Sequence, residues 1–417
     1  MKRVLMIAFH FPPYAGGSGL QRTLRFVQHL RTYDWEPIVL TAHPMAYERT
    51  SPDLVGAIPE GISVTRTVAL DAARHLSLKG RFLRVLALPD RWMTWRFSAV
   101  RAGVDLVRRY RPCAIWSTYP IATAHVIANA VRAKTGLPWL ADFRDPMAQD
   151  GYPSNPRVWR SFKRIEEITL RKARFSVFTT PGAARSYSER YPDAAERIRI
   201  IENGFDEESF SANEKFSAQR EALIPGAITL LHSGIVYPSE RDPTHLFQAL
   251  RQLDEARTIR PRDVRIRFRA AVHDKHLLEL AERYGVASYI EVLPSIPYVD
   301  ALEEMMRADG LLVLQASNCN AQIPAKTYEY LRAGRPIIGL TDPVGDTAGL
   351  LRAAGADALA RLDSAEEIAV VLCRFIADLV GGRIFAVDKR YVQLKSRRSG
   401  SQSLAKLLDE ACDTRQP

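Results

Sequence analysis

The chain has 417 residues, of which 47% are hydrophobic and 25% are charged, and its formal net charge is +11. This composition is typical of a globular protein, and the length exceeds one ordinary core, so we expect two or three domains. The chain contains no apolar run near the roughly 18 residues that span a bilayer. Its four scattered cysteines exclude a disulfide framework or a paired-cysteine zinc site. The basic surplus indicates anionic partners, which could be nucleic acid, acidic lipid or phosphorylated substrates.

The first elements along the chain form a β-α-β unit. The N-terminal stretch predicts a buried strand over 4–8 rather than a signal peptide, because no small-residue cleavage site follows it. Apolar residues spaced three and four apart predict a helix over 20–30, and a second strand follows at 37–40.

The glycines between this strand and helix are candidates for ligand contact. Gly16 and Gly17 precede the helix, where backbone amides can approach a phosphate or a sugar. A dinucleotide-binding loop would need glycine at Arg22 and would leave the strand without two intervening prolines, so we do not expect NAD. The alternative is a tight turn that requires a positive φ.

Residues 66–111 are strongly basic and aromatic, with eleven Lys and Arg against three Asp. Such a segment can dock on an anionic membrane face, with cations on the headgroups and aromatic residues at the interface. The alternative is a pair of helices that pack their aromatic side chains inward. No recognised nucleic-acid-binding motif accompanies the segment, so we do not expect nucleic acid as a partner.

A later strand, which begins at Trp139, ends in a charged cluster of Asp142, Arg144 and Asp145. Open parallel sheets bind ligands at the carboxyl ends of their strands, so these three side chains are candidates for ligand contact. A structural ion pair between Arg144 and one of the aspartates is the alternative.

The turn signal Asn203-Gly204 and a polar stretch over 211–226 divide the chain. A second α/β series then begins, with strands over 228–232, 264–271, 289–292, 310–314 and 336–340. We therefore expect two parallel-sheet α/β domains, over 1–205 and 206–380, around a hinge near residue 205. The remaining residues, 381–417, are expected to form a helical tail, which could cross back to the N-terminal domain.

The stretch 322–340 combines a helix with a buried strand. Pro324 and Gly334 suit the start and the end of the helix, and Lys326 and Glu329 share one of its faces. Arg241 stands seven residues after Gly234 in the loop that follows the first strand of this half. Two cations suit a diphosphate, and a carboxylate can accept hydrogen bonds from both ribose hydroxyls. The alternative is a solvated Lys–Glu pair on an ordinary surface helix.

Taken together, these motifs resemble the family 4 retaining glycosyltransferases of the GT-B fold, from residue 1 to about residue 380. The resemblance rests on FPPYAGGSGLQR, IENGFDEESF, HSGIVYPSERDP and IPAKTYEYLRAGRPIIGL. It implies an α/β architecture of two Rossmann-like domains that face each other across a cleft. The N-terminal domain would bind the acceptor and the C-terminal domain the nucleotide sugar.

The resemblance also implies roles for the candidate residues. The catalytic set would be Arg241, Lys326 and Glu329, which would hold the diphosphate and the ribose. The donor would also contact Gly16, Gly17, Ser233 and Gly234, and the acceptor would lie near Asp142, Arg144 and Asp145. We expect no metal and no cofactor, because protein cations and a helix N-terminus can stabilise the leaving diphosphate.

Two positions depart from the family pattern. Ala321 stands where the first Glu of the Glu-x7-Glu motif is usual, and Asn320 or Gln322 could take its place by hydrogen bonding. In the N-terminal domain a histidine is common after the strand that ends near Trp116, but here Ser117 opens that loop and His125 lies further on, within the predicted helix.

The expected activity is transfer of a hexose from a nucleotide diphosphate sugar to a glycan or lipid-linked saccharide in cell-surface polysaccharide biosynthesis. The chain would then be cytoplasmic, either free or peripheral on the inner face of the plasma membrane. Two alternatives stay open. One is a non-catalytic nucleotide- or glycan-binding component, which Ala321 and Ser117 favour, and the other is a sugar-nucleotide epimerase.

Overall fold

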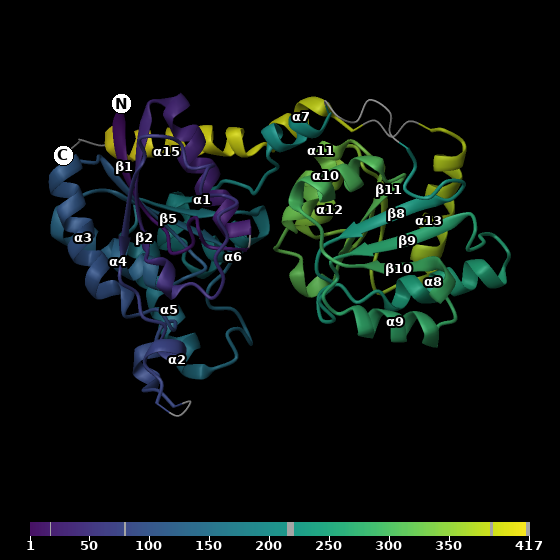
Figure 1. Cartoon of the computed structure of the whole chain (residues 1–417), viewed down its shortest axis with the longest axis horizontal. Helices are drawn as coiled ribbons and strands as arrows, with labels where there is room; N and C mark the ends of the chain where they lie inside the picture. The colour runs from purple at the N-terminus through teal and green to yellow at the C-terminus, as the bar shows by residue number, and fades with distance from the viewer. Residues whose placement is uncertain (17, 79–80, 215–220, 384–386, 414–417) are drawn as a thin grey trace. The chain divides into compact units, whose positions relative to one another are not determined.

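The computed structural model describes residues 1–16, 18–78, 81–214, 221–383 and 387–413. The chain divides into two compact units (Figure 1). The N-terminal unit comprises Met1–Asn203 with Arg397–Pro417, and the C-terminal unit comprises Gly204–Ser396. Each unit is built on one sheet whose strand pairs are all parallel among the described residues. The predicted α/β class with two parallel sheets is confirmed.

The described part of the N-terminal unit contains a seven-stranded sheet in the order β3-β2-β1-β4-β5-β6-β7. Its strands are β1 (Lys2–Ile7), β2 (Trp35–Ala42), β3 (Ser63–Thr67), β4 (Ala114–Thr118), β5 (Trp139–Arg144), β6 (Phe175–Phe178) and β7 (Ile198–Ile200). The order reverses between β1 and β4, and open parallel sheets bind ligands at such a switch point.

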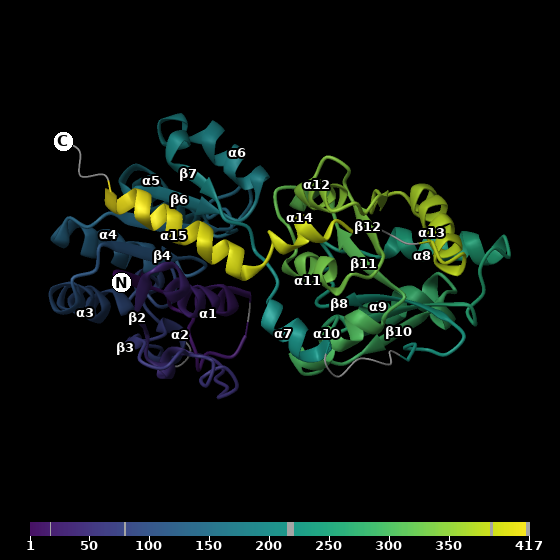
Figure 2. The ribbon, with the colours of Figure 1, turned by 90° about the horizontal axis from the view of Figure 1, so that it is seen from above.

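Helices cover both faces of this sheet. They are α1 (Ser18–His29), α2 (Ala72–His75), α3 (Trp95–Tyr110), α4 (Thr123–Thr135), α5 (Pro156–Lys172), α6 (Pro181–Arg190) and α15 (Arg397–Asp413). The helices α1 and α15 pack against each other on one face (Figure 2), and α3 to α6 cover the other. The end of the chain therefore belongs to the N-terminal unit.

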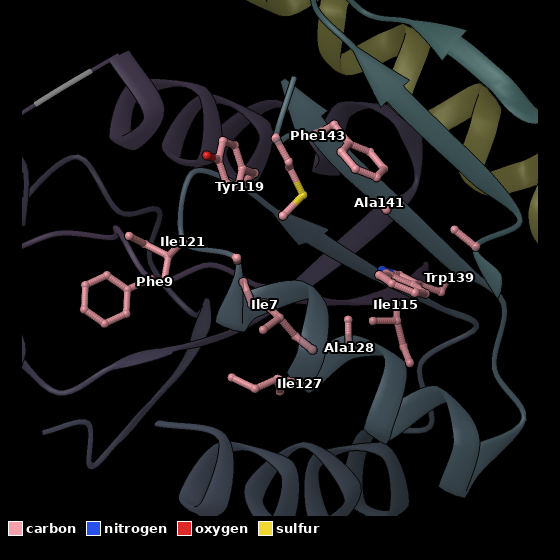
Figure 3. Packing of buried hydrophobic residues seen from close by; sticks show 14 of the residues in the cluster. Ile7, Phe9, Ile115, Tyr119, Ile121, Ile127, Ala128, Trp139, Ala141 and Phe143 are labelled. Carbon is pink, nitrogen blue, oxygen red and sulfur yellow. The ribbon is translucent and has the colours of Figure 1, made fainter. Parts of the chain in front are cut away.

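The core of this unit follows from the alternation of side chains along parallel strands that are buried on both faces. In β1, Leu5 and Ile7 point into the cluster that α3 and α4 share, and Val4 and Met6 point toward α1 and α15. Figure 3 shows the first cluster, in which side chains of β1, β4 and β5 meet those of α4.

In the described part of the C-terminal unit, six strands pair in the order β10-β9-β8-β11-β12-β13. They are β8 (Ile228–Ser233), β9 (Val264–Arg269), β10 (Ile290–Leu293), β11 (Gly310–Gln315), β12 (Ile337–Thr341) and β13 (Ala358–Ala360). The helices are α7 (Glu207–Glu214), α8 (Thr244–Glu255), α9 (Asp274–Arg283), α10 (Tyr298–Arg307), α11 (Ala325–Ala333), α12 (Asp346–Ala353), α13 (Ala365–Val380) and α14 (Lys389–Gln393). One face of the sheet packs on α8, α9 and α13, and the other on α7, α10, α11, α12 and α14.

Helix α11 forms as its flanking residues predict. Pro324 is the N-cap residue, and Gly334 ends the helix in the left-handed conformation with φ 66°. Tyr328, Tyr330 and Leu331 are buried, while Lys326 and Glu329 stay half-buried. The helix thus turns its polar residues toward the carboxyl edge of the sheet.

The basic segment 66–111 is folded along most of its length, and residues 79–80 lie outside the described part. Trp95 is fully buried in the core, and Trp92 packs against Phe9 at a centroid distance of 4.9 Å. Leu83 and Phe97 are 70% and 74% exposed. The aromatic residues therefore divide between the core and the surface. Of the helices that the structure describes, none has both the length and the apolar character of a membrane span.

Candidate functional site

The candidate residues of the C-terminal unit gather at the switch point between β8 and β11. Ser233 ends β8, Gly234 and Arg241 lie in the loop to α8, and Lys326 and Glu329 lie on α11. The backbone N–H of Ser233 donates to the Tyr330 hydroxyl of α11 over 2.7 Å. The predicted grouping at this edge is therefore present, although its ligand and its roles stay predictions.

Lys326 is held by a residue outside the predicted site. Its Nζ lies 2.7 Å from Nε2 of His232, which is fully buried near the end of β8. His232 Nδ1 lies 2.9 Å from the backbone carbonyl of Leu312. A carbonyl oxygen can only accept, so Nδ1 carries the proton and Nε2 accepts from Lys326.

Gly234 provides the space for this contact. Its φ is +117°, and a Cβ atom there would lie 3.0 Å from Nζ and 3.2 Å from Cε of Lys326. Any side chain is strained at that φ, and a Cβ there would also press on the end of the Lys326 side chain. The φ is thus the main reason for glycine at this position.

Arg241 is fixed within its own loop. Its Nη1 donates to the Ile235 carbonyl over 2.6 Å, and its guanidinium lies 5.2 Å from the centroid of the Tyr237 ring. The backbone N–H of Arg241 donates to the Tyr237 carbonyl over 2.8 Å. The cation is therefore held in place before any ligand arrives.

The charges at this edge act on one another. Burial lowers the pKa of Lys326 well below its ordinary value, the positive Arg241 lowers it further, and Glu329 opposes the shift. Burial and then Lys326 lower the pKa of His232 well below its ordinary value, so the imidazole is neutral. Glu329 Oε1 accepts a hydrogen bond of 2.8 Å from the Tyr298 hydroxyl at the start of α10.

The loop that departs from the family pattern has its own hydrogen bonds. Asn320 Nδ2 donates to Asp342 Oδ2 over 2.7 Å, and this bond is the main reason that the pKa of Asp342 is lowered. The Gln322 backbone carbonyl accepts from Gln315 Nε2 over 2.9 Å. The Asn320 amide thus binds Asp342. That Asn320 or Gln322 takes the place of the first Glu of the Glu-x7-Glu motif remains a prediction.

A cavity of about 360 Å³ lies beside this group at the same sheet edge. It is lined by Asp242, His245, Gln315, Ala316, Ser317, Asp342, Arg361, Leu362 and Asp363. Arg241, Lys326 and Glu329 are not among its lining residues, so it is distinct from the predicted site.

In the N-terminal unit, the predicted glycines lie before α1. Gly16 is exposed with φ +135°, and Gly17 lies outside the described residues. At Gly19, a Cβ would collide with Nη1 of Arg144. The guanidinium of Arg144 therefore packs directly against the start of α1 and would have to move for any larger residue at this position.

The charged cluster at the end of β5 has three different environments. Asp142 is fully buried and forms an ion pair with Arg22 of α1. Arg144 is buried with φ 60°, and its Nη1 lies 3.3 Å from the Tyr119 carbonyl. Asp145 is exposed. Asp142 thus has a structural partner, and the acceptor role of all three residues stays a prediction.

His125 lies within α4, as the sequence predicts. It is fully buried, and its Nδ1 lies 2.8 Å from Ser117 Oγ, which also accepts from the Trp139 indole N–H over 2.8 Å. Burial lowers the pKa of His125 to about 4. This histidine is therefore a neutral core residue.

Comparisons with known proteins agree with this architecture. A glycosyltransferase from Rickettsia africae ESF-5 is 12% identical with a TM-score of 0.67 over 99% of both chains. Anabaena Alr3699/HepE in complex with UDP and glucose is 13% identical, with a TM-score of 0.64 over 98% of this chain and 100% of that one. The UDP-GlcNAc 2-epimerase from Neisseria meningitidis bound to UDP-GlcNAc is 11% identical, with a TM-score of 0.54 over 98% and 100%. A search of the curated proteins finds no match.

At such low identities these structures show the fold, and the fold is GT-B. Residues 16–204 match the family model described as a glycosyl transferase 4-like domain. The N-terminal unit therefore contains a glycosyl transferase 4-like domain. The predicted fold is confirmed, and the domain match agrees with the predicted family and enzyme class.

Proposed function

We propose that the chain moves a hexose, with retention, from a nucleotide diphosphate sugar to a glycan or lipid-linked saccharide in cell-surface polysaccharide biosynthesis. The observation that carries the proposal is the grouping of Arg241, Lys326 and Glu329 at the β8–β11 switch point. Such switch points are where parallel sheets bind nucleotides. A structure of the similar HepE contains UDP and glucose, which supports a nucleotide sugar as the donor.

The two cations have the chemistry that the leaving diphosphate needs. As the bond to the sugar breaks, negative charge develops on the diphosphate, and fixed cations stabilise that charge. Arg241 is already held by Ile235 and Tyr237, and Lys326 by His232. The N-terminus of α11 adds its positive dipole end close to Lys326. These groups can do this work without a metal ion, and we propose a metal-independent reaction.

Glu329 is suited to the ribose. A carboxylate has acceptor sites for two hydroxyl groups, and Oε1 already accepts one hydroxyl, that of Tyr298. In the N-terminal unit, we propose that Gly16 and Gly17 approach the donor and that Arg144 and Asp145 contribute to acceptor binding. The support is the place of Gly16 before α1 and that of Arg144 and Asp145 at the end of β5, at the carboxyl edge of the sheet.

The proposal is tested by release of nucleoside diphosphate from a panel of donor sugars and saccharide acceptors. Substitutions Glu329→Ala and Arg241→Ala are each expected to lower turnover at least about 100-fold, the size of effect that one stabilising group has in other enzymes. Glu279→Ala and Arg251→Ala serve as matched controls, because both side chains are exposed on α9 and α8. Equal turnover of the two site variants and their controls would contradict the site.

A second candidate is an epimerase of the same fold, which the similarity to the UDP-GlcNAc 2-epimerase favours. Product analysis without acceptor separates the two, because an epimerase converts its sugar nucleotide alone whereas a transferase needs the acceptor. Donor binding without turnover in both assays would instead indicate the non-catalytic component that Ala321 suggests.

We further propose that the chain acts in the cytoplasm and attaches to the inner membrane face through residues 74–111. Leu78, Leu83 and Phe97 are exposed there, in the same segment as the exposed cations Arg81, Arg96 and Arg101. Anionic headgroups and apolar acyl chains would meet these two kinds of side chain.

A further inference from the structure

His232 is a titratable side chain in the middle of an apolar strand, and the proposed reaction gives it no direct role. It lies near the end of β8, is fully buried, and touches Lys326 across 2.7 Å. A buried imidazole with two well-defined partners holds those partners in place, because both of its ring nitrogens are engaged.

The direction of these hydrogen bonds fixes what His232 does. Nδ1–H donates to the Leu312 carbonyl of β11, so Nε2 accepts one N–H of Lys326. A lysine amine has up to three donors, and this contact uses one of them. Gly234 also lies close to the amine, because a Cβ atom built on this glycine would be 3.0 Å from Nζ. The amine is thereby held between His232 of β8 and the loop that follows this strand.

Charged and titratable groups face this amine from three elements. His232 comes from β8, Arg241 from the loop to α8, and Glu329 and Tyr330 from α11 itself. Burial and Arg241 lower the pKa of Lys326, and Glu329 only partly offsets them. Burial raises the pKa of Tyr330, so its hydroxyl stays neutral and accepts from Ser233. The surroundings thus lower the pKa of Lys326 while no anion is bound.

We propose that His232 is a positioning residue of the donor site, and that binding of the diphosphate is coupled to uptake of one proton by Lys326. This inference rests on the proposed function. The proton comes from solvent and converts the amine to an ammonium ion as the two phosphate charges arrive. His232 accepts from either form, so it holds Nζ in one place through the change.

The coupling gives binding a definite pH dependence. A nearby anion raises the pKa of an amine, so the complex binds more protons than the free protein. Affinity is therefore constant at low pH and falls as pH rises through the lowered pKa of free Lys326, by at most about tenfold for each pH unit. An ordinary lysine would show this fall only near its usual pKa of about 10.4.

The experiment is isothermal titration calorimetry of the full chain with UDP-, GDP-, ADP- and dTDP-sugars, continued with the tightest binder. The phosphates of these probes are esterified on both sides and do not titrate, so any proton taken up belongs to the protein. Titrations at about pH 8 in two buffers of different ionisation enthalpy count that proton. We expect net proton uptake for wild type and none for Lys326→Arg, whose guanidinium stays charged.

The histidine variants test the positioning role. His232→Phe removes the acceptor and is expected to weaken binding about tenfold, the usual effect of losing a hydrogen bond to a charged group. His232→Gln keeps an acceptor near the place of Nε2 and is expected to stay within about threefold of wild type. His276→Phe, at an exposed position of α9, is the matched control and is expected to bind normally. If His232→Phe does not fold, His232→Gln tests the positioning role and Lys326→Arg tests the proton uptake.

Three outcomes overturn parts of this account in distinguishable ways. Binding of the donor by wild type with no proton uptake overturns the coupling. Wild-type affinity in a folded His232→Phe variant overturns the positioning role. No binding of any probe by wild type overturns the proposed function, and the inference falls with it.

Discussion

Arg22 of α1 and Asp142 of β5 form a two-pronged ion pair in the interior of the N-terminal unit. Arg22 Nε lies 3.0 Å from Oδ2 and Nη2 lies 2.9 Å from Oδ1 of the fully buried carboxylate. The same guanidinium donates to the backbone carbonyls of Ile201 and Glu202. One side chain thus joins α1, β5 and the last residues of the unit before the chain leaves it.

Removing Arg22 alone is expected to destabilise the N-terminal unit strongly. Arg22→Met leaves the Asp142 carboxylate buried without its cation, which typically costs about 3–5 kcal/mol. Urea denaturation measures the loss in free energy of unfolding. Arg108→Met is the control, because the pair of Arg108 with Asp105 is exposed on α3, and it should change stability by less than about 0.5 kcal/mol. A loss of similar size in both variants would contradict the structural role of the pair.

Gly234→Ala is expected to damage donor binding as well as stability. The left-handed φ of +117° makes any side chain costly, by roughly 1–3 kcal/mol, and the new methyl group also meets Lys326. The control is Gly285→Ala, which has φ +69° but no atom within 4 Å of the added Cβ. We expect both variants to lose stability in denaturant titrations, and only Gly234→Ala to lose affinity for a nucleotide sugar about tenfold or more. Equal binding by the two variants would show that the Lys326 contact has no part in the site.

Much of the fold could be predicted because buried parallel strands are continuous apolar runs with little ambiguity. The expected strand over 310–314 is Gly310–Gln315, and the one over 228–232 is Ile228–Ser233. The short edge strands β3 and β13 were not predicted, since five and three residues with partial burial leave no clear period. Helices α5 and α6 were also absent from the expected elements.

The candidate site also contains residues that could be predicted from the sequence and contacts that could not. Lys326 and Glu329 could be placed together because they are three residues apart on one helix and therefore share a face. Arg241 could be placed at the same sheet edge because its loop follows a strand. The partner of Lys326 could not be predicted, since His232 is 94 residues away in sequence and meets it only through the pairing of β8 with β11. For the same reason the ion pair of Asp142 with Arg22, 120 residues away, was not predicted.

Membrane attachment is expected to depend on charge and on the exposed apolar residues of the basic segment. Wild type should float with anionic vesicles and much less with neutral ones, and salt should weaken the binding because exposed charges are screened. Replacing both Leu83 and Phe97 with Ser should lower binding at least about tenfold, since each buried side chain contributes roughly 1.5–3 kcal/mol. The double change Val370→Ser and Val380→Ser is the control, because both valines are exposed on α13. Equal flotation with neutral and anionic vesicles would remove the electrostatic argument.

Stability should fall in mild acid, in part because of His125. Its pKa is lowered by burial from 6.5 to about 4 in the folded chain, so between those values the unfolded chain binds more protons. The contribution is fully present above pH 6.5 and is lost as pH falls toward about 4, by about 3 kcal/mol in all. The buried His232 acts with the same sign in the C-terminal unit.

The measurement is urea denaturation of wild type and His125→Asn across this pH range. The Asn side chain can still accept from Ser117 near the place of Nδ1 but does not titrate. The variant should be less stable at neutral pH, because it leaves a cavity, and should lose about 3 kcal/mol less than wild type on acidification. His276→Asn, at an exposed position, should follow the wild-type curve. Parallel pH curves for wild type and His125→Asn would show that His125 is not the source of the acid sensitivity.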